Sequence, residues 1–313
     1  MQKVLITGGT GLVGGQLTKH LTRKGYAVII LTRKLPSADH QQPGVSYAVW
    51  DINKQTIDLK AVQEADFIIH LAGAGVVDKR WTDSYKKEIV DSRTRSSALL
   101  LDSLQNNVHS VKAVVSASAI GWYGADPAPG GRTHFIESDP PASSFLGETC
   151  QLWEQGIARV TSLGIRLAKI RIGIVLSNEG GALVEFKKPI QLGIAGILGN
   201  GQQVISWIHI DDLCRIFIEA MENGEWQGSY NAVAPNPVSN KQLTLALARQ
   251  LKGRFYIPLH VPPFVLKLMM GESSVEVLKS TTVSNDKVRL TGFTYGYPTI
   301  EAALHQLCNP ATS

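Results

Sequence analysis

The sequence is poor in cysteine and in long apolar runs. Its only cysteines, Cys150, Cys214 and Cys308, lie far apart and form no CxxC pair, so neither a disulfide framework nor a metal site is expected. No uncharged apolar run reaches the roughly 18 residues needed to cross a bilayer. Even the segment 261–270 is broken by prolines and Lys267. Because no secretory leader is recognisable either, we expect a cytoplasmic protein with no membrane partner.

Dense blocks of one charge are also missing. The formal net charge is +5 over 313 residues, and no Lys/Arg block alternates with aromatic residues. This pattern predicts no nucleic-acid partner. A mild positive balance favours instead a small-molecule substrate or cofactor that carries phosphate.

The first half of the chain alternates short β-branched runs with longer amphipathic stretches, which indicates βαβ units and a parallel sheet. The expected strands are Lys3–Thr7, Ala27–Thr32, Phe67–Leu71, Ala113–Ser118 and Ala168–Leu176. The expected helices between them are Gly14–Lys24, Thr82–Gln105 and Gly147–Leu163. Right-handed crossovers place the helices on both faces, so the predicted fold class is α/β with a doubly wound parallel sheet.

The composition changes after Leu176, where glycine-rich and proline-rich segments separate shorter elements. We therefore predict a nucleotide-binding domain over 1–176, with part of the later chain returning to it. Residues 177–313 are expected to form a smaller substrate-side subdomain, which includes a small C-terminal domain over 258–307.

A glycine-rich segment follows the first strand directly, with Gly8, Gly9, Gly11 and Gly14 spaced as GxxGxxG and GxGxxG. Glycines allow a tight turn and close approach of a pyrophosphate, and the next helix directs its N-terminal amides at that anion. The alternative is a merely structural turn, but a strand before and a helix after favour a Rossmann dinucleotide site. Its predicted ligands are Gly8, Thr10, Gly11, Leu12, Val13 and Gly14.

The second strand ends in Thr32-Arg33-Lys34 and not in an acidic residue. An acid there would accept hydrogen bonds from the ribose 2′-hydroxyl and would repel a 2′-phosphate. Arg33 can pair with that phosphate, with Thr32 as a hydroxyl donor and Lys34 as a second cation. The predicted cofactor is therefore NADP(H); the alternative is a solvated pair of loop charges.

Further motifs resemble the extended short-chain dehydrogenase/reductase superfamily: His70-Leu71-Ala72-Gly73, Ser116-Ala117-Ser118 before Tyr123-Gly124, and Arg171-Ile172-Gly173. More narrowly, Lys79-Arg80-Trp81, Ser92-Arg93, Gly199-Asn200-Gly201, Trp207 to Asp212 and Gly271-Glu272-Ser273-Ser274 resemble YfcH-like proteins of the NAD(P)-dependent epimerase/dehydratase kind, which carry a C-terminal domain of unknown function. The resemblance implies cofactor contacts from Leu71, Ala72, Gly73 and Val175. It also implies a homodimer that pairs through helices 82–105 and 147–163.

The same resemblance implies that the superfamily's acid/base pair is missing from this chain. The superfamily uses a tyrosine and a lysine four residues later as its acid/base pair. If Glu154 matches the superfamily's following glutamate, Leu146 stands in place of the tyrosine and Cys150 in place of the lysine. The YfcH-like pattern implies that Glu88 and Arg93 lie near the ribose and nicotinamide, where Arg93 could partly replace the missing charge. The alternative makes both ordinary exposed helix charges.

Two hydroxyls near the fourth strand are candidates for proton transfer. Ser118 matches the superfamily's active-site serine, and Tyr123 is the nearest phenol, although a pocket-wall aromatic is an equal alternative for it. His209, Asp211 and Asp212 suggest an acid/base or metal cluster, but we favour a structural junction in which an aspartate caps the next helix.

Two functions remain open. The first is an NADP-dependent, epimerase-like oxidoreductase that acts on a small hydroxyl or carbonyl compound. The second is a non-catalytic NADP(H)-binding protein, a redox sensor or interaction module that has lost the acid/base pair. A strict nucleotide-sugar epimerase is disfavoured because Leu146 cannot supply the base.

Overall fold

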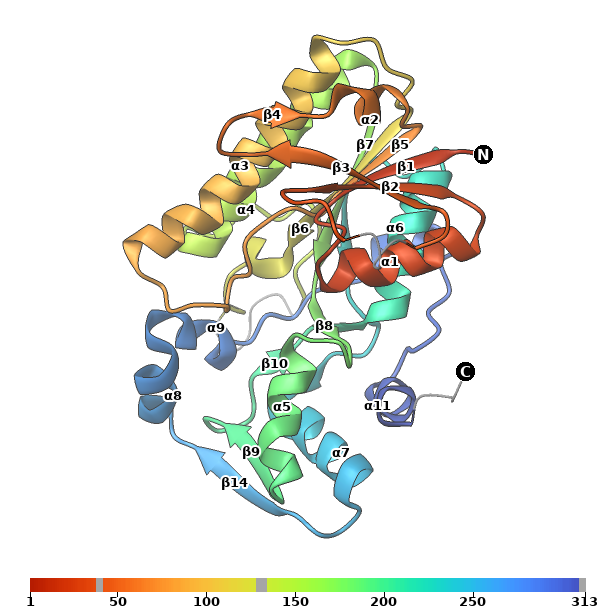
Figure 1. The fold of residues 1–313 in the computed structure, drawn as a ribbon. Coiled ribbons are helices and arrows are strands. Elements are labelled where there is room, and N and C mark those ends of the chain that lie inside the picture. The colour runs from red at the N-terminus through yellow and green to blue at the C-terminus, as the bar shows by residue number, and fades with distance from the viewer. Residues whose placement is uncertain (38–41, 128–133, 310–313) are drawn as a thin grey trace.

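An eight-stranded sheet in the order β12-β7-β6-β5-β1-β2-β3-β4 forms the centre of the computed structural model, which describes residues 1–37, 42–127 and 134–309 (Figure 1). Its strands are β1 (Lys3–Thr7), β2 (Ala27–Thr32), β3 (Val45–Asp51), β4 (Thr56–Ile57), β5 (Phe67–His70), β6 (Ala113–Ala119), β7 (Arg166–Ile172) and β12 (Gly228–Ala232). Every neighbouring pair is parallel except β3 with β4. The predicted doubly wound α/β fold is confirmed.

The strand order reverses at β1. The chain passes from β1 to β2 and β3 on one side and later fills the other side with β5, β6 and β7. In open α/β sheets, ligands bind in the crevice at the carboxyl ends of strands where this reversal occurs. The crevice here lies between the ends of β1 and β5, beside Thr7 and His70.

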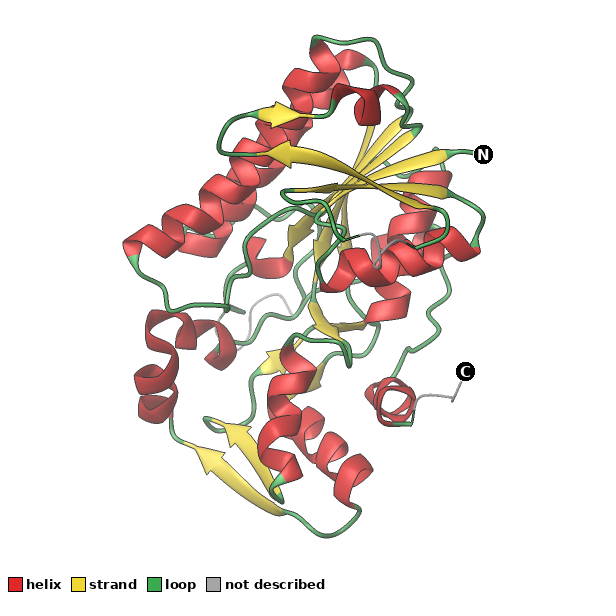
Figure 2. Cartoon of the chain, in the orientation of Figure 1, coloured by secondary structure: helices red, strands yellow, loops and turns green. Residues whose placement is uncertain are grey.

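Helices cover both faces of the sheet (Figures 1 and 2). One face carries α1 (Leu12–Arg23) and α6 (Ile210–Glu222), which bury residues such as Leu17 and Phe217. The opposite face carries α2 (Leu59–Gln63), α3 (Asp83–Gln105) and α4 (Phe145–Ala158), and its core includes Leu100 and Ile157. Both faces are therefore apolar, as a buried parallel sheet requires.

Two expected elements are each divided in the structure. The strand predicted over Ala168–Leu176 is two strands, β7 and β8 (Ile174–Leu176), which separate at Gly173. A Cβ on Gly173 would lie 2.6 Å from the Ser206 carbonyl oxygen, so the backbone of the 206 segment approaches there. The helix predicted over Gly147–Leu163 is α4 followed by a 3-10 turn over Arg159–Leu163, and α4 begins at Phe145 because Ser144 caps it.

The later chain builds a second layer of small elements around its own core. These are α5 (Ala182–Gln191), β9 (Ile194–Leu198), β10 (Val204–Ile205), β11 (Trp207–His209), β13 (Val238–Ser239), α7 (Asn240–Lys252), β14 (Ile257–Val261), α8 (Pro263–Met270), a 3-10 turn over Gly271–Ser273, α9 (Ser274–Leu278), α10 (Asp286–Leu290) and α11 (Ile300–Cys308). The buried residues Trp207, Leu243 and Leu304 belong to this core. Residues 210–232 return to the main sheet as α6 and β12.

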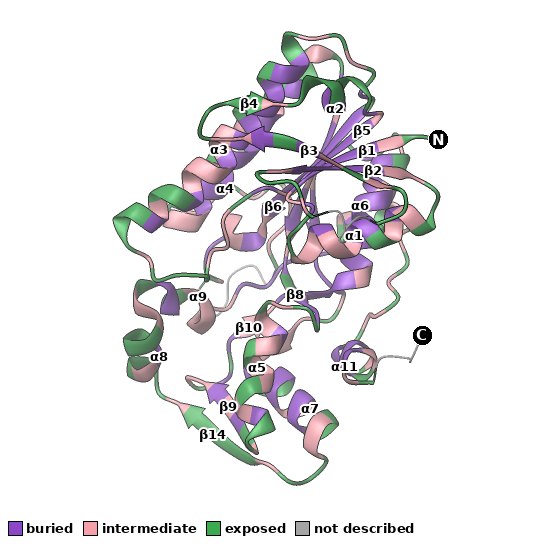
Figure 3. Cartoon of the chain, viewed as in Figure 1, coloured by how far each residue is buried: buried purple, intermediate pink, exposed green. Residues whose placement is uncertain are grey.

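Exposure is uneven over the molecule. Figure 3 shows the central strands buried, whereas β14 and much of α8 face solvent. Within the described ranges, no helix has the length and apolar character needed to span a membrane.

Candidate functional site

The turn after β1 forms a cradle of backbone. Gly8 has a φ of +69°, and its carbonyl oxygen accepts the Gly11 N–H at 3.0 Å. A Cβ on Gly14 would lie 2.6 Å from the Gly9 Cα and closer still to the Gly8 carbonyl oxygen. The chain therefore passes so close to the start of α1 that Gly14 has no room for a side chain.

The start of α1 offers free amides to this cradle. Gly11 is the N-cap, no side chain caps the helix, and its first turn, which contains Leu12 and Val13, has no acidic residue. Thr10 is exposed at the turn. Uncapped N–H groups at a helix N-terminus attract an anion. The backbone cradle and the open helix end together fit the pyrophosphate of a dinucleotide.

Two exposed cations stand at the end of the neighbouring strand β2. Within the described part of the chain, the side chains of Arg33 and Lys34 make no hydrogen bond or ion pair. The Thr32 hydroxyl donates to the Lys34 carbonyl oxygen at 3.0 Å and so shapes this turn. The predicted 2′-phosphate contacts are thus available to a ligand.

The carboxyl ends of β1 and β5 are joined by a buried histidine. The Thr7 hydroxyl accepts the N–H groups of Leu71 and Ala72, both at 3.1 Å, so its proton is donated to His70 Nδ1 at 2.7 Å. His70 Nε2 then donates to the Ser97 hydroxyl at 3.2 Å. Burial, with the nearby Arg93 charge, lowers the pKa of His70 to about 3, so the ring is neutral and holds the crevice wall in place.

Past Ala72 the wall opens at Gly73, which is exposed and packs against Arg93. A Cβ on Gly73 would lie 3.0 Å from the Arg93 Cζ. The Arg93 guanidinium donates to the carbonyl oxygens of Ala74 and Ile89, both at 3.0 Å, and lies 4.8 Å from the Trp153 ring centroid. Among the described residues, Arg93 has only carbonyl and π partners and no carboxylate, so its positive charge remains available to a ligand at the crevice.

Glu88 lies apart from Arg93 although both are on α3. Its side chain is exposed and pairs with Lys79 at 3.3 Å. The structure thus brings Arg93 to the crevice beside Gly73, whereas Glu88 has the contacts of the exposed helix charge that was the alternative. Its predicted cofactor contact stays a prediction.

Val175 reaches the cradle from the far half of the chain. It lies in β8, and a Cβ on the following Gly181 would be 3.7 Å from the Val175 carbonyl oxygen and 3.3 Å from Leu12 Cδ2. The segment after β8 therefore lies against the first turn of α1, where the sequence places the pyrophosphate.

The first turns of α4 carry Leu146 and Cys150, the residues that the sequence predicts in the acid/base positions. Leu146 is half-buried, and a Cβ on Gly121 would lie 3.2 Å from its Cβ. The Cys150 thiol faces the Ala119 carbonyl oxygen at 3.7 Å, and burial, opposed by the Arg93 charge, raises its pKa to about 11. The thiol is therefore protonated at neutral pH and supplies no base.

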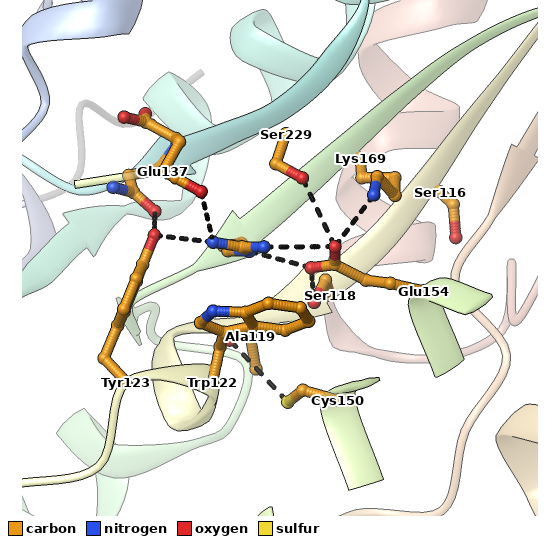
Figure 4. Close-up of polar contacts among 12 residues, drawn as sticks. Ser116, Ser118, Ala119, Trp122, Tyr123, Glu137, Cys150, Glu154, Lys169 and Ser229 are labelled. Atoms are coloured by element: carbon orange, nitrogen blue, oxygen red, sulfur yellow. Dashed lines mark hydrogen bonds and ion pairs between the residues drawn. The ribbon is translucent and has the colours of Figure 1, made fainter. Parts of the chain in front are cut away.

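A buried ionic network lies beneath these positions (Figure 4). Glu154 accepts from Arg171 Nε at 2.8 Å and from Arg171 Nη2 at 3.2 Å, and it pairs with Lys169 at 2.9 Å. Burial alone would raise the pKa of Glu154, but the hydrogen bonds and charge of Arg171, with Lys169, lower it. The carboxylate is ionised and ties α4 to β7.

Both predicted proton donors join this network. The Ser118 hydroxyl donates to Glu154 at 2.8 Å. The Tyr123 hydroxyl donates to Asn231 Oδ1 at 2.6 Å and accepts from Arg171 Nη1 at 2.9 Å, and burial raises its pKa to about 12. Tyr123 thus has the contacts expected of an aromatic residue in the wall of a pocket, which was the alternative considered for it. The catalytic roles of Ser118 and Tyr123 stay predictions.

Sequence reasoning used Glu154 and Arg171 only as alignment markers and missed their pairing. One signal was available: Lys169 and Arg171 alternate with the apolar Ala168 and Ile170 inside a predicted strand. A charged residue in a buried strand requires an ionic partner. The nearest unexplained acid on an adjacent helix is Glu154.

The cluster before α6 is structural, but the expected cap was wrong. The N-cap is His209, whose Nδ1 accepts the Asp211 N–H at 3.1 Å. Asp211 accepts from Gln16 at 2.8 Å and His20 at 3.0 Å, which, despite burial, lower its pKa to about 2. Asp212 instead accepts the N–H groups of Gly296 and Tyr297.

The structure also brings together two motifs that lie far apart in the sequence. Arg80 donates to the Leu268 carbonyl oxygen at 2.5 Å, and a Cβ on Gly271 would lie 3.5 Å from Arg80 Nε. Lys86 pairs with Glu272 at 2.6 Å. The C-terminal segment thus packs on the loop and helix that follow β5.

In the described ranges, no group of three or more His, Cys, Asp or Glu residues is placed to hold a metal ion.

Comparison with known proteins agrees with this architecture. Residues 4–146 match the NAD dependent epimerase/dehydratase family, and residues 261–307 match a domain of unknown function (DUF1731). Epimerase family protein SSP1921 of Staphylococcus saprophyticus is 35% identical over 309 residues, which cover 98% of this chain and 99% of that protein. The chloroplastic epimerase family protein SDR39U1 homolog of Arabidopsis thaliana is 33% identical over 306 residues, 97% of this chain and 86% of that protein.

A solved structure extends the similarity to three dimensions. The human epimerase family protein SDR39U1, crystallised with NADPH, has a TM-score of 0.85 and 28% identity, with 99% of this chain and 100% of that chain covered. The glycine cradle, the doubly wound sheet and the full-length relatives lead to one assignment: the chain belongs to the NAD(P)-binding epimerase family of extended short-chain dehydrogenase/reductase fold.

Proposed function

We propose that this protein binds NADP(H) and acts as an epimerase-like oxidoreductase on a small hydroxyl- or carbonyl-bearing substrate. The observation that carries the proposal is a backbone cradle beside two unpaired cations, Arg33 and Lys34, at the end of β2. The human relative was solved with NADPH, which supports the same choice of cofactor.

Charge at the end of β2 distinguishes the two nicotinamide cofactors. A 2′-phosphate carries negative charge and several acceptor oxygens, and a guanidinium can pair with it through two N–H groups. Arg33 has no internal partner to give up within the described residues, so pairing costs no existing contact. NADPH should therefore bind more tightly than NADH.

On the reaction side, this chain would act mainly through position and charge. A bound nicotinamide dinucleotide supplies hydride-transfer chemistry. Arg93 would hold positive charge near the ribose in place of the missing lysine, and Gly73 leaves room beside it. Tyr123 or Ser118 would have to release a proton from its internal hydrogen bond to serve as the donor.

Titration of cofactor tests the first part. Arg33→Ala should weaken NADPH binding by about tenfold to a hundredfold, the loss of one charge-assisted contact of roughly 1.5 to 3 kcal/mol, and leave NADH binding unchanged. Arg23→Ala is the matched control, because Arg23 is an exposed cation at the far end of α1. Equal affinity of the unaltered protein for both cofactors would overturn the assignment.

A second function, non-catalytic NADP(H) binding, is favoured by one observation. Leu146 and Cys150 replace the acid/base pair, and the hydroxyl protons of Ser118 and Tyr123 are held internally. Stopped-flow oxidation of bound NADPH by a panel of carbonyl compounds separates the two. Turnover that falls in Tyr123→Phe supports the enzyme, whereas no oxidation by any compound supports the binding protein.

We further propose a homodimer through α3 and α4, because members of the superfamily commonly pair through these helices as a four-helix contact. Sedimentation of the purified protein at micromolar concentration measures this directly. A monomeric mass there contradicts the dimer.

A further inference from the structure

A surface hollow lies between the end of α7 and the start of β14, at the end of the molecule away from the main sheet (Figure 1). Its volume is about 740 Å³, and its lining residues are Arg249, Gly253, Arg254, Tyr256 and Pro258. Nothing in the proposed NADP(H) chemistry uses this region.

Two guanidiniums line the hollow without a partner. Neither the Arg249 nor the Arg254 side chain makes a hydrogen bond or ion pair with any described residue. Elsewhere on the surface, Arg215 pairs with Asp212 at 2.9 Å. The difference has a cause in the sequence, because residues 226–271 contain five Lys and Arg and no Asp or Glu. The chain itself supplies no neighbouring carboxylate for these arginines along this stretch.

Tyr256 and Pro258 line the hollow beside the cations. Because side chains alternate along a strand, the exposed Ile257 and Leu259 project on the opposite face of β14 and lie outside the hollow. The hollow therefore combines two cations with an aromatic ring and a proline, a combination characteristic of an interaction surface.

The free edge of β14 is unsuited to strand pairing. The Ile257 N–H and the Val261 carbonyl oxygen bond toward β9, so the alternate residues Pro258 and His260 present their backbone outward. Proline has no N–H to donate, and a proline on an edge strand blocks the addition of another strand. A partner must therefore be recognised through its side chains.

We propose that this hollow docks an acidic, amphipathic segment of a partner protein. Carboxylates of the segment pair with Arg249 and Arg254, and its apolar side chains pack on Tyr256 and Pro258, which line the same hollow. Guanidinium and aromatic groups are the side chains that contribute most at protein interfaces. Both arginines line one hollow of about 740 Å³, which suits a few projecting carboxylates better than the broad plane of lipid headgroups.

Fluorescence anisotropy on the full-length protein tests this with a set of labelled 12-residue peptides that combine Glu with Leu at different spacings. The same peptides with Gln for Glu are the matched ligands. At least one acidic peptide should bind more than tenfold tighter than its Gln counterpart. Arg249→Gln/Arg254→Gln should remove that preference, whereas Arg159→Gln, an exposed cation at the end of α4, should keep it.

Retained NADPH binding and an unchanged thermal transition show that the double variant is folded, independently of the docking result. Equal binding of the Glu and Gln peptides, or no binding of any acidic peptide, overturns the proposal. So does arginine-dependent binding to vesicles of phosphatidylglycerol with no peptide binding, because the occupant would then be a lipid surface.

Discussion

The cradle on the proposed nucleotide side comes from one short stretch, Thr7 to Gly14, whereas the proposed reaction side draws on α3, α4, β7 and β12. At Gly8 and Gly14 of the cradle, an added Cβ would meet backbone atoms at 3.0 Å or less. On the reaction side, buried charges such as Glu154 and Arg171 meet across long sequence separations. The shape of the cradle therefore depends on the size of its residues, whereas the stability of the buried network depends on the charge of its residues.

This contrast predicts that substitutions on the two sides fail in different ways. A substitution at a cradle glycine should lower the affinity for the cofactor while most of the fold remains intact. A changed charge in the network should destabilise the protein while the folded fraction still binds cofactor. The hydrogen-bond and ion-pair partners of Glu154 are Ser118, Lys169, Arg171 and Ser229, which lie outside the cradle.

The largest effect is expected from Glu154→Gln. The substitution leaves the Arg171 guanidinium and the Lys169 ammonium without their shared carboxylate, and breaking a buried pair costs about 3–5 kcal/mol. Urea unfolding measures the loss, and NADPH titration of the folded protein should change by less than about twofold. Glu148→Gln, on the exposed side of the same helix, is the control and should stay within about 0.5 kcal/mol. A loss below about 1 kcal/mol for Glu154→Gln would mean that the network is not stabilising.

The next effect is expected from Gly14→Ala. Its new Cβ would collide with the Gly8 carbonyl oxygen, which cannot rotate away as a flexible side chain could, because it belongs to the backbone. The cradle must widen, so NADPH affinity should fall on the order of a hundredfold, about 2.8 kcal/mol. Gly15→Ala is the matched control: a Cβ there meets no atom within 4 Å, and alanine favours the helix. Equal affinities of the two variants would contradict the cradle geometry.

A smaller, coupled effect is expected at Cys150 and Arg93. Cys150→Lys introduces the lysine predicted for this position but places an ammonium in the field of the Arg93 guanidinium, which acts on the Cys150 thiol. Arg93→Asn, which removes the guanidinium charge, should relieve that repulsion. A double-mutant cycle in unfolding free energy should give a favourable coupling of about 1–3 kcal/mol. Additive effects would show that Arg93 does not occupy the lysine's role.

The sequence predicts well whatever depends on neighbours in the chain. The glycine spacing, the strand before it and the helix after it all lie within residues 3–24, so the cradle could be inferred without tertiary knowledge. The same holds for Ala27–Thr32 and its terminal Arg33. Strand β3 was overlooked although Val45, Tyr47 and Val49 alternate with Ser46, Ala48 and Trp50, because only one of those two faces is deeply buried.

Features that depend on distant partners were not predictable in this way. The break at Gly173 follows from the approach of Ser206, and the cap by His209 depends on which imidazole nitrogen faces the Asp211 N–H. The Glu154–Arg171 pair requires α4 and β7 to be adjacent. In each case the local sequence permits several outcomes, and tertiary packing selects one.

The smallest effect is expected from Cys150→Ala, which tests whether the residue in the lysine position takes part in chemistry at all. The thiol is buried, its pKa is raised to about 11, and within the described part of the chain its one hydrogen-bond partner is the Ala119 carbonyl oxygen at 3.7 Å. Removing it deletes one buried sulfur, so the cost should be about 1 kcal/mol, with NADPH affinity and any NADPH oxidation unchanged. Thermal unfolding and cofactor titration measure both quantities. Cys214→Ala, a second buried thiol in α6, separates general packing loss from a local role. If Cys150→Ala abolished oxidation while Cys214→Ala did not, the reaction side would depend on a thiol and not on the charge of Arg93.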